Sequence, residues 1–352
     1  MSCAIESAVE PGDPPDGWAA PVHRDGVLAI PGSFHLHHGG TLEGVHVAWR
    51  IAGAASGPVI AVLGGISAGR DVFGTNSSPE SGWWPTMVGP GLAVDSERFR
   101  ILGIDFLGGS GVTTGPRATD RTPFPSVSSY DQAALLERVL EHLGCDRLHA
   151  IVGASYGGMV GLAFAERFPQ QVGRLIVVSA ADRAHPLATA WRSIERRVVR
   201  FGATLGDAAG GLEIARALAM ATYRSGAEFE QRFAGEPEWH DERAGFPVEQ
   251  YLFARGAAYA RSYVPEAFVC LSESIDLHQV EPARVTVPTT LVAIIEDQLV
   301  PIADMRALAA RLGGRVNLVE LSSIYGHDAF LKESERLTPV FVSALNEDRA
   351  DA

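Results

Sequence analysis

Cysteine is scarce in this sequence. The 352 residues contain three cysteines, at positions 3, 145 and 270, and no two of them have the spacing of a redox or zinc motif. An odd, sparse set is typical of a protein that keeps its thiols reduced, so we expect a cytoplasmic location and no disulfide framework. A chain of this length can bury a core large enough to fold without disulfides or a structural metal.

Long apolar runs and basic residues are also few. The apolar runs are far shorter than the roughly 20 residues needed to cross a bilayer, and the start of the chain is acidic and proline-rich, so we expect neither a membrane span nor a targeting signal. Lys and Arg number 29 against 42 Asp and Glu, which gives a formal net charge of −13. Such a surface repels phosphate backbones and anionic lipid, so we expect neither nucleic-acid binding nor membrane binding. An anionic small substrate would need a local cluster of arginines.

Short apolar runs alternate with helical patterns over most of the chain. The runs that indicate buried strands are residues 58–63, 99–105, 148–152, 175–179, 289–295 and 316–321. Helical spacing marks residues 129–143, 159–168 and about 329–345. This alternation is typical of an α/β fold with a mostly parallel, doubly wound sheet that is covered on both faces. Residues 34–52 alternate through Gly39 and Gly40 and predict an antiparallel hairpin.

The alternation stops between residues 183 and 270. This segment is rich in Ala and Arg, is helical in pattern and shows no strand-like run. We therefore expect a helical cap at 183–270, inserted into an α/β core that is formed by residues 26–182 and 271–352. Residues 1–25 are expected to be a loosely ordered leader.

A Gly-x-Ser-x-Gly sequence at residues 153–157 places Ser155 between a predicted strand and a predicted helix. This is the context of the nucleophile elbow in the α/β-hydrolase fold, where the glycines permit a sharp turn and the serine hydroxyl is exposed at the edge of the sheet. The pentapeptide alone also occurs in glycine-rich turns that serve only packing. The flanking strand and helix favour a catalytic Ser155.

A serine hydroxyl needs a general base, and in this fold the acid and then the histidine follow the serine along the chain. His327 lies after the last predicted strand and before the last predicted helix, where the base belongs. Asp297 follows the strand at 289–295 and would orient His327, with its neighbour Glu296 as the alternative acid. A loop histidine without a catalytic role is the alternative for His327.

An oxyanion hole should complete this machinery. We expect it to use the backbone N–H of Tyr156 and the N–H of Ile66, in the loop after the strand at 58–63. Two other motifs predict no chemistry. The histidines in residues 35–38 have no Asp or Glu at ligand spacing, so no metal site is expected. The glycine-rich residues 108–111 lack the lysine and the spacing of a phosphate-binding loop.

Several longer motifs are more specific than the pentapeptide. They are residues 82–91 (GWWPTMVGPG), 95–99 (DSERF), 107–109 (LGG), 114–116 (TGP), 221–225 (ATYRS), 274–277 (SIDL) and 326–331 (GHDAFL). With the elbow, this set resembles the homoserine O-acyltransferase family over about residues 30–345. The resemblance implies an α/β-hydrolase fold, acyl transfer to the hydroxyl of L-homoserine in methionine biosynthesis, and a homodimer with its caps in contact.

The resemblance also implies roles for individual residues. Ser155, Asp297 and His327 match the catalytic triad of the family, and Ile66 and Tyr156 match its oxyanion positions. Two further positions match residues that bind homoserine in the family.

The first of these is Arg224, which matches an arginine expected to bind the homoserine carboxylate in a bidentate manner. The second is Asp328, which matches the carboxylate expected to hold the amino group. The alternatives are that Arg224 forms a salt bridge of the cap and that Asp328 is a helix N-cap.

The sequence departs from the family at three places. Tyr156 replaces the usual methionine of the elbow, the loop at 64–68 reads GGISA instead of HALSG, and the loop after residue 116 is shortened. Such a divergent form favours the succinyl-using members over the acetyl-using ones. A succinyl donor carries a second carboxylate, for which the candidate partners are Arg70, Arg192 and Arg196.

The prediction for function is therefore transfer of succinyl from succinyl-CoA to L-homoserine by a ping-pong mechanism through an acyl-enzyme on Ser155. Acyl-CoA is then a co-substrate, and no cofactor or metal is expected. Acetyl-CoA as the donor is one alternative. A serine hydrolase that cuts esters or thioesters with water is the second alternative, and an inactive binding domain is the third.

Overall fold

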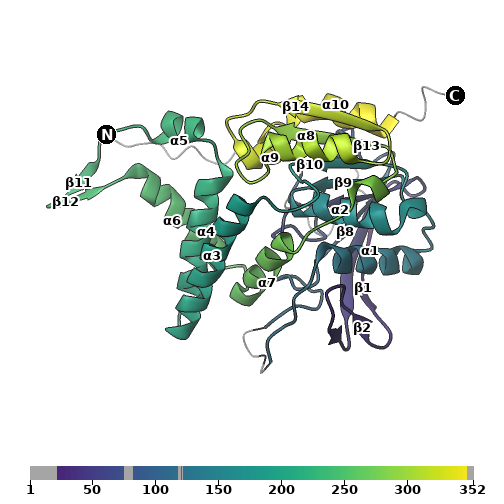
Figure 1. Ribbon diagram of the computed structural model, residues 1–352, viewed down its shortest axis with the longest axis horizontal. Coiled ribbons are helices and arrows are strands. Elements are labelled where there is room, and N and C mark those ends of the chain that lie inside the picture. Colours follow the sequence, from purple (N-terminus) through teal and green to yellow (C-terminus); the bar gives the residue numbers. More distant parts are fainter. Residues whose placement is uncertain (1–21, 75–81, 118–119, 121, 347–352) are drawn as a thin grey trace.

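The computed structural model describes residues 22–74, 82–117, 120 and 122–346. Within these residues, the centre of the molecule is an eight-stranded sheet in the order β1-β4-β8-β5-β9-β10-β13-β14 (Figure 1). Its strands are β1 (Val22–Ala29), β4 (His46–Gly53), β5 (Val59–Leu63), β8 (Arg100–Ile104), β9 (Ala150–Ala154), β10 (Leu175–Val178), β13 (Thr289–Ile294) and β14 (Val316–Leu321). The β1–β4 and β4–β8 pairs are antiparallel, and the remaining pairs are parallel. The prediction of a mostly parallel sheet is confirmed.

Helices cover both faces of this sheet. One face packs against α1 (Ser129–Leu143), α2 (Tyr156–Arg167) and α8 (Ile302–Arg311). The other face packs against α9 (Ala329–Lys332), α10 (Ser334–Asn346) and a loop that contains β6 (Val88–Gly89) and β7 (Val94–Asp95). Alternate residues of β5 enter the two cores, with Ala61 and Leu63 in the first and Ile60 and Val62 in the second. Burial on both faces explains why these strands are continuous apolar runs in the sequence.

The predicted hairpin at residues 34–52 forms only in part. A short pair, β2 (Phe34–His35) and β3 (Thr41–Leu42), turns through Gly39 and Gly40, which have φ angles of 95° and 90°. The longer strand β4 pairs instead with β1. Because β1 begins at Val22, the predicted end of the leader at residue 25 is wrong. The rest of the predicted leader, residues 1–21, lies outside the described residues.

Between β10 and β13 the chain is mainly helical. Its elements are α3 (Pro186–Thr204), α4 (Ala208–Tyr223), α5 (Gly226–Phe233), β11 (Glu238–His240), β12 (Arg243–Gly245), α6 (Pro247–Ala260) and α7 (Pro265–Asp276). Figure 1 shows α3, α4 and α6 standing together beside the sheet domain. We propose that residues 183–276 act as the cap, and the name is used for them below.

Two details of the cap differ from the prediction. The predicted boundary at residue 270 is wrong because it falls inside α7. The expectation of no strand is also wrong, because β11 and β12 form a hairpin that turns at Asp241, which has a φ of 54°. Aspartate tolerates this left-handed conformation. Strands of three residues are too short to show an alternating pattern in the sequence.

Three short 3-10 turns complete the described elements: η1 (Pro169–Gln171), η2 (Pro282–Arg284) and η3 (Gly326–Asp328). In the described part of the chain, no helix has both the length and the apolar character needed to span a membrane.

Candidate active site

Ser155 occupies a sharp turn between β9 and α2. Its backbone angles are φ 55° and ψ −122°, a conformation that costs an L-residue about 1–3 kcal/mol and persists only where the surroundings enforce it. The neighbouring glycines allow the chain to pass this closely. A Cβ atom on Gly157 would lie 2.1 Å from the carbonyl oxygen of Leu63, and one on Gly153 would lie 2.4 Å from the carbonyl oxygen of Gly157. The turn therefore has the form predicted for a nucleophile elbow.

The hydroxyl of Ser155 contacts a histidine instead of capping its own helix. Ser155 is the N-cap residue of α2, yet its side chain makes no cap hydrogen bond. Its Oγ lies 2.8 Å from His327 Nε2, and His327 Nδ1 lies 2.7 Å from Asp297 Oδ2. The other oxygen of Asp297 accepts hydrogen bonds from the N–H groups of Leu299 and Val300. The structure thus brings together the serine, acid and histidine that the sequence placed after three different strands.

The contact between His327 and Asp297 is buried. His327 is 6% exposed and Asp297 is 4% exposed. Burial lowers the pKa of His327, but the charge of Asp297 and its hydrogen bond outweigh this effect and leave the pKa above the ordinary 6.5. With Asp297 ionised, Nδ1 carries the proton that it donates, and the lone pair of Nε2 faces the Ser155 hydroxyl. The imidazole is therefore oriented to accept the proton of Ser155.

The alternative acid, Glu296, faces another segment. Its carboxylate accepts hydrogen bonds from the Ser323 N–H at 2.6 Å and from the Ser322 hydroxyl. These contacts hold the stretch of chain that leads from β14 to His327. The structure therefore places Asp297 beside the imidazole and gives Glu296 a supporting position.

Within the described residues, the backbone amides of the two predicted oxyanion positions are available to a ligand. Tyr156 is the first residue of α2, where an N–H has no acceptor within its own helix. Among the described residues, neither the Tyr156 N–H nor the Ile66 N–H donates a hydrogen bond. The loop of Ile66 is held by the cap, because the Tyr263 hydroxyl donates to the Ile66 carbonyl at 2.7 Å and the Tyr259 hydroxyl lies 2.9 Å from Ser67 Oγ.

The side chain of Tyr156 is accommodated by a polar partner. The residue is 1% exposed, and its hydroxyl lies 2.6 Å from Ser274 Oγ on α7. Its ring packs edge-on against Phe106. A buried tyrosine hydroxyl needs such a partner. Ser274 therefore explains how a tyrosine can be buried at this position of the elbow.

Ser155 lies where two hollows meet. Both are lined by Ile66, Ser155, Tyr223, Ile275 and His327. The first, here called the α3 hollow, extends toward Arg192 and Glu195 of α3. The second, here called the α4 hollow, extends toward Trp83, Arg216 and Asp328. A single nucleophile thus faces two spaces, and each of them contains charged side chains.

Arg224 and Asp328 contact each other. Arg224 Nε donates to Asp328 Oδ2 at 2.9 Å, and its Nη1 donates to Glu228 Oε1 at 2.7 Å. Asp328 lines the α4 hollow, whereas Arg224 lines neither hollow. The salt bridge considered for Arg224 is therefore present. Asp328 is the N-cap residue of α9, but its side chain makes no cap hydrogen bond.

Of the three arginines considered for a donor carboxylate, only Arg192 lines a hollow with Ser155. Its Nη2 lies 2.6 Å from Asp276 Oδ1, and Arg196 contacts the other oxygen of Asp276 at the same distance. Arg70 lies elsewhere.

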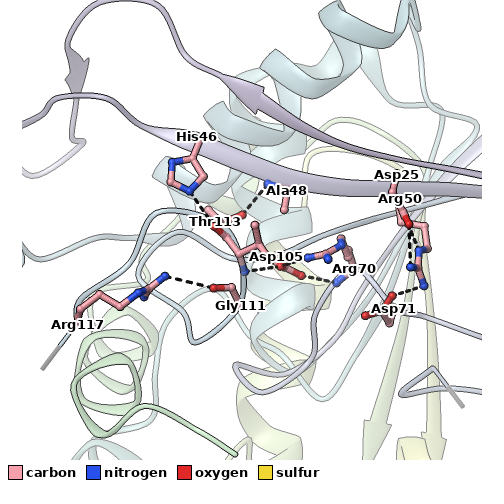
Figure 2. A network of polar contacts seen from close by, with 11 residues as sticks. Asp25, His46, Ala48, Arg50, Arg70, Asp71, Asp105, Gly111, Thr113 and Arg117 are labelled. Atoms are coloured by element: carbon pink, nitrogen blue, oxygen red, sulfur yellow. Dashed lines mark hydrogen bonds and ion pairs between the residues drawn. The ribbon is translucent and has the colours of Figure 1, made fainter. Parts of the chain in front are cut away.

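Figure 2 shows Arg70 bound to Asp105, within a network that also joins Arg50 to Asp25 and Asp71. The backbone N–H of Arg70 donates to the same carboxylate at 2.8 Å. This ion pair ties the oxyanion loop to the end of β8, so Arg70 has a structural partner.

Sequence reasoning missed two charged residues of the site. Arg216 projects from α4 into the α4 hollow and lies over the rings of Tyr223 and Tyr259, at 5.2 and 4.6 Å from their centroids. Glu195 is 4% exposed in the α3 hollow, and burial raises its pKa to about 7. One signal was available: Arg216 interrupts an apolar helical stretch, residues 214–221, with Tyr223 two turns later on the same side. Glu195 lies among charged residues and gave no signal.

The tryptophan pair at residues 83 and 84 supports the site from the sheet side. Trp84 is fully buried, and its Nε1 donates to the Phe330 carbonyl at 2.8 Å, which fixes α9 directly after His327. Trp83 stacks on Trp84 and lines the α4 hollow. This block therefore positions the histidine and forms one wall of a hollow.

The histidines at residues 35–38 make ordinary structural contacts. The ring of His37 stacks on Tyr130 at 4.2 Å, and the backbone N–H of His37 donates to Asp131 at 2.7 Å. Among the described residues, no three His, Cys, Asp or Glu side chains are grouped so that they could hold a metal ion.

Comparison with known proteins agrees with this geometry. Residues 58–334 match the family described as alpha/beta hydrolase fold. A homoserine O-succinyltransferase of Xanthomonas campestris pv. campestris is 42% identical over 330 residues, which are 94% of this chain and 86% of that protein. The chain belongs to the homoserine O-acyltransferase family. The resemblance inferred from the motifs is thereby confirmed, together with the α/β-hydrolase fold and the acyltransferase class.

Other relatives show the range of this family. A serine O-succinyltransferase of Litchfieldella anticariensis is 33% identical, with 90% of this chain and 97% of that protein covered. The crystal structure of homoserine O-acetyltransferase from Bacillus anthracis superimposes with a TM-score of 0.82 at 18% identity, covering 94% of this chain and 98% of that one. The second similarity supports the fold alone. Family membership therefore leaves the acyl donor and the acceptor to be assigned from the site.

Proposed function

We propose that this protein transfers a succinyl group from succinyl-CoA to the hydroxyl of L-homoserine, in methionine biosynthesis, through an acyl-enzyme on Ser155. The observation that carries the proposal is the position of the serine hydroxyl, 2.8 Å from His327 Nε2 at the junction of two hollows. Transfer through an acyl-enzyme must bring first the acyl donor and then the acceptor hydroxyl to the same nucleophile, and the two hollows offer room for both substrates. The 42% identical homoserine O-succinyltransferase supports the choice of donor and acceptor.

In the first half-reaction, Ser155 Oγ attacks the thioester carbonyl and His327 Nε2 takes its proton. The negative charge on the carbonyl oxygen is stabilised by the N–H groups of Tyr156 and Ile66, and Asp297 stabilises the charged imidazole. The carbon–sulfur bond then breaks, and the sulfur leaves as CoA with the proton from His327. The acyl group remains on Ser155 as an ester.

In the second half-reaction, the homoserine hydroxyl gives its proton to His327 and attacks the ester carbonyl. The bond to Ser155 Oγ breaks, and this oxygen takes the proton back from the imidazole. Every proton and acyl group is thereby accounted for, so we expect no cofactor and no metal beside the acyl-CoA co-substrate. The scheme predicts ping-pong kinetics.

We assign the carboxylate of the succinyl donor to Arg192. This arginine lines the α3 hollow with Ser155, and Arg70 and Arg196 do not. Glu195 lies in the same hollow, and with a pKa of about 7 its carboxyl is partly neutral near neutral pH and can then donate a hydrogen bond to a second carboxylate. Arg192 keeps its pair with Asp276 in either case, but an acetyl group offers no carboxylate to Arg192 or Glu195, which favours succinyl-CoA over acetyl-CoA.

We assign the amino group of homoserine to Asp328, which lines the α4 hollow. In the structure Arg224 donates to Asp328, and it also donates to Glu228. We therefore propose that Arg224 orients Asp328. A direct contact between Arg224 and the homoserine carboxylate stays a prediction from the family resemblance.

We further propose that the protein works as a cytoplasmic homodimer with caps in contact. Leu187, Ile194 and Phe201 follow each other at seven-residue intervals on α3, so they share one face, and they are 49%, 54% and 58% exposed. An apolar stripe on the outside of the cap fits a surface that a second copy covers.

One experiment separates the proposal from its alternatives. The protein is supplied with succinyl-CoA or acetyl-CoA, with L-homoserine, L-serine or no acceptor, and the CoA thiol and the acylated product are measured. Intact-protein mass spectrometry after brief exposure to each donor identifies the group on Ser155, with Ser155→Ala as the control. We expect a succinyl adduct and O-succinylhomoserine. Faster turnover of acetyl-CoA would reject the donor, and free succinate formed equally with or without homoserine would indicate a hydrolase.

A further inference from the structure

Ser179, the residue that follows β10, combines two unusual features. Its backbone has a φ of 52°, and among the described residues other than glycine only Ser155 and Asp241 also have a positive φ. An L-residue rarely adopts this conformation without a structural or functional reason. The residue is 1% exposed, and within the described part of the chain its Oγ has no hydrogen-bond partner. Because buried hydroxyl groups are normally hydrogen-bonded, this one is suited to a ligand.

Ser179 lies beside the nucleophile. In the register of the parallel strands β9 and β10, Ala154 lies opposite Val178. Ser155 and Ser179 therefore follow at the ends of adjacent strands. The backbone N–H of Ser179 donates to the Val292 carbonyl on β13 at 3.1 Å, and both serines line the α3 hollow. The Ser179 hydroxyl thus belongs to the sheet side of a space that Ser155 faces.

The cap side of the α3 hollow has a surplus of positive charge. Arg192 and Arg196 share one carboxylate, that of Asp276. Arg192 donates to it through Nε at 2.8 Å, but its buried Nη2, which lies 2.6 Å from the same oxygen, has no hydrogen bond of suitable geometry among the described residues. A guanidinium with an unused donor is suited to a second carboxylate.

The length of the donor acyl group connects these two sides. A succinyl ester on Ser155 carries its carboxylate three bonds beyond the ester carbon, a span of about 3.8 Å. Neighbouring strands of a sheet lie about 4.8 Å apart, so a group of this length at the end of β9 reaches the end of β10. An acetyl group ends one bond beyond the ester carbon and does not extend that far.

We propose that the Ser179 hydroxyl donates a hydrogen bond to the carboxylate of the succinyl group and, together with Arg192 of the cap, selects succinyl over uncharged acyl groups. The inference rests on the proposed function and deepens it, because it adds a residue of the sheet domain that recognises the donor. The carboxylate is then bound from the sheet and from the cap at once.

The test uses two donors whose acyl chains have the same number of carbon atoms, succinyl-CoA and butyryl-CoA. Butyryl has a methyl group where succinyl has its carboxylate. Release of the CoA thiol gives kcat/KM for each donor, and we expect the wild type to prefer succinyl-CoA strongly. In Ser179→Ala the value for succinyl-CoA should fall about 10- to 100-fold, as for a lost hydrogen bond to a charged group, and the value for butyryl-CoA should change little.

Two further variants separate the hydroxyl from other effects. Ser179→Gly also removes the hydroxyl but adopts a φ of 52° without strain, so it should show the same loss with succinyl-CoA. Ser96→Ala is the matched control and should keep the donor preference. Ser96 is 2% exposed and its hydroxyl also lacks a partner among the described residues, but it lines neither hollow. Acylation of Ser155 by p-nitrophenyl acetate, which has no carboxylate, shows that each variant is folded.

The outcomes distinguish this inference from the proposed function. If Ser179→Ala lowers kcat/KM equally for both donors, or for neither, the assignment of Ser179 is wrong while transfer of succinyl stands. A wild-type value for succinyl-CoA in Ser179→Gly would attribute the loss in Ser179→Ala to the backbone and would also reject the assignment. If the wild type uses butyryl-CoA or acetyl-CoA faster than succinyl-CoA, the proposed donor falls together with this inference.

Discussion

Two adjacent carboxylates occupy different positions at the end of β13. Asp297 contacts His327 Nδ1 at 2.7 Å, whereas Glu296 contacts the backbone and side chain of the segment that follows β14. Glu296 therefore serves as a control for Asp297, because it is a neighbouring carboxylate that binds another segment instead of His327. A charge at the right place in the sequence is insufficient if its oxygen atoms face another segment.

We predict that Asp297→Asn lowers kcat by about 10⁴-fold, because the amide no longer holds the imidazole in the tautomer that accepts the serine proton. Glu296→Gln should keep kcat within a few-fold, with at most a modest loss of thermal stability. Release of CoA under saturating substrates measures both. Equal losses in the two variants would contradict the assigned acid.

A second residue-scale prediction concerns pH. The proposed mechanism needs neutral His327, and the pKa of His327 lies above its ordinary 6.5, with the charge of Asp297 as the cause that raises it against burial. The value of kcat/KM for the acyl donor should therefore rise with pH through a midpoint above 6.5. In Asp297→Asn the residual activity should have a lower midpoint, because burial then acts without the compensating charge. A midpoint that is unchanged in the variant would speak against this coupling.

At the scale of elements, the sequence predicted α1 and β14 with their observed bounds and most other core elements within a few residues. Helices and strands whose apolar faces are buried locally carry their periodicity in the sequence. Strand β1 was missed because it lies at the edge of the sheet and carries polar residues between its apolar ones. Its Gly26 is required by contact, since a Cβ there would lie 2.3 Å from the ring of Trp49.

The same distinction applies to the site. Ser155, Asp297 and His327 could be predicted to meet because each follows a recognisable strand and the strand ends meet at one edge of a sheet. The positions of Arg216 and Glu195 depend on how the helices of the cap lie over that edge, which no local pattern encodes.

The end of the chain contains one further error of prediction. The last helix was predicted as continuous, whereas the structure has two helices, α9 and α10, that separate at Glu333. Both helices pack against the same core, so the apolar pattern of the sequence does not mark the break between them.

The elbow supplies the prediction at this scale. Gly157→Ala should lower the free energy of unfolding by about 3 kcal/mol or prevent folding, because its Cβ would lie 2.1 Å from the carbonyl oxygen of Leu63 in the central strand β5. Gly226→Ala is the control, since no atom lies within 4 Å of a Cβ there and alanine favours the helix α5. Urea denaturation compares the two variants. Comparable stability of both would mean that the elbow is not closely packed.

For the whole molecule, the cap and the sheet domain expose different surfaces. Exposed large apolar side chains within the described residues include eight from the cap: Leu187, Ile194, Phe201, Leu205, Ile214, Trp239, Phe246 and Phe253. The net charge of −13 keeps most of the surface polar. Apolar exposure that is concentrated on one part of a charged molecule is typical of an interface.

We therefore predict that the 37.4 kDa chain sediments as a dimer and that Phe201→Asp shifts it toward the monomer. Val342→Asp is the control, because Val342 is also exposed on a helix, at 41%, but lies on α10 outside the cap. Analytical ultracentrifugation distinguishes the two. A dimer that persists in Phe201→Asp and dissociates in Val342→Asp would place the interface on the sheet domain.

Ile66 lines both hollows, and the loop that carries it is fastened by tyrosine hydroxyls of the cap. The ester on Ser155 must persist after CoA leaves and until the acceptor binds. During this interval, water competes with the acceptor hydroxyl for the ester. The isoleucine is buried and forms part of the wall of both spaces beside Ser155. We thus expect the ratio of acyl transfer to hydrolysis to depend on the hydrogen bonds by which Tyr259 and Tyr263 hold the loop of Ile66.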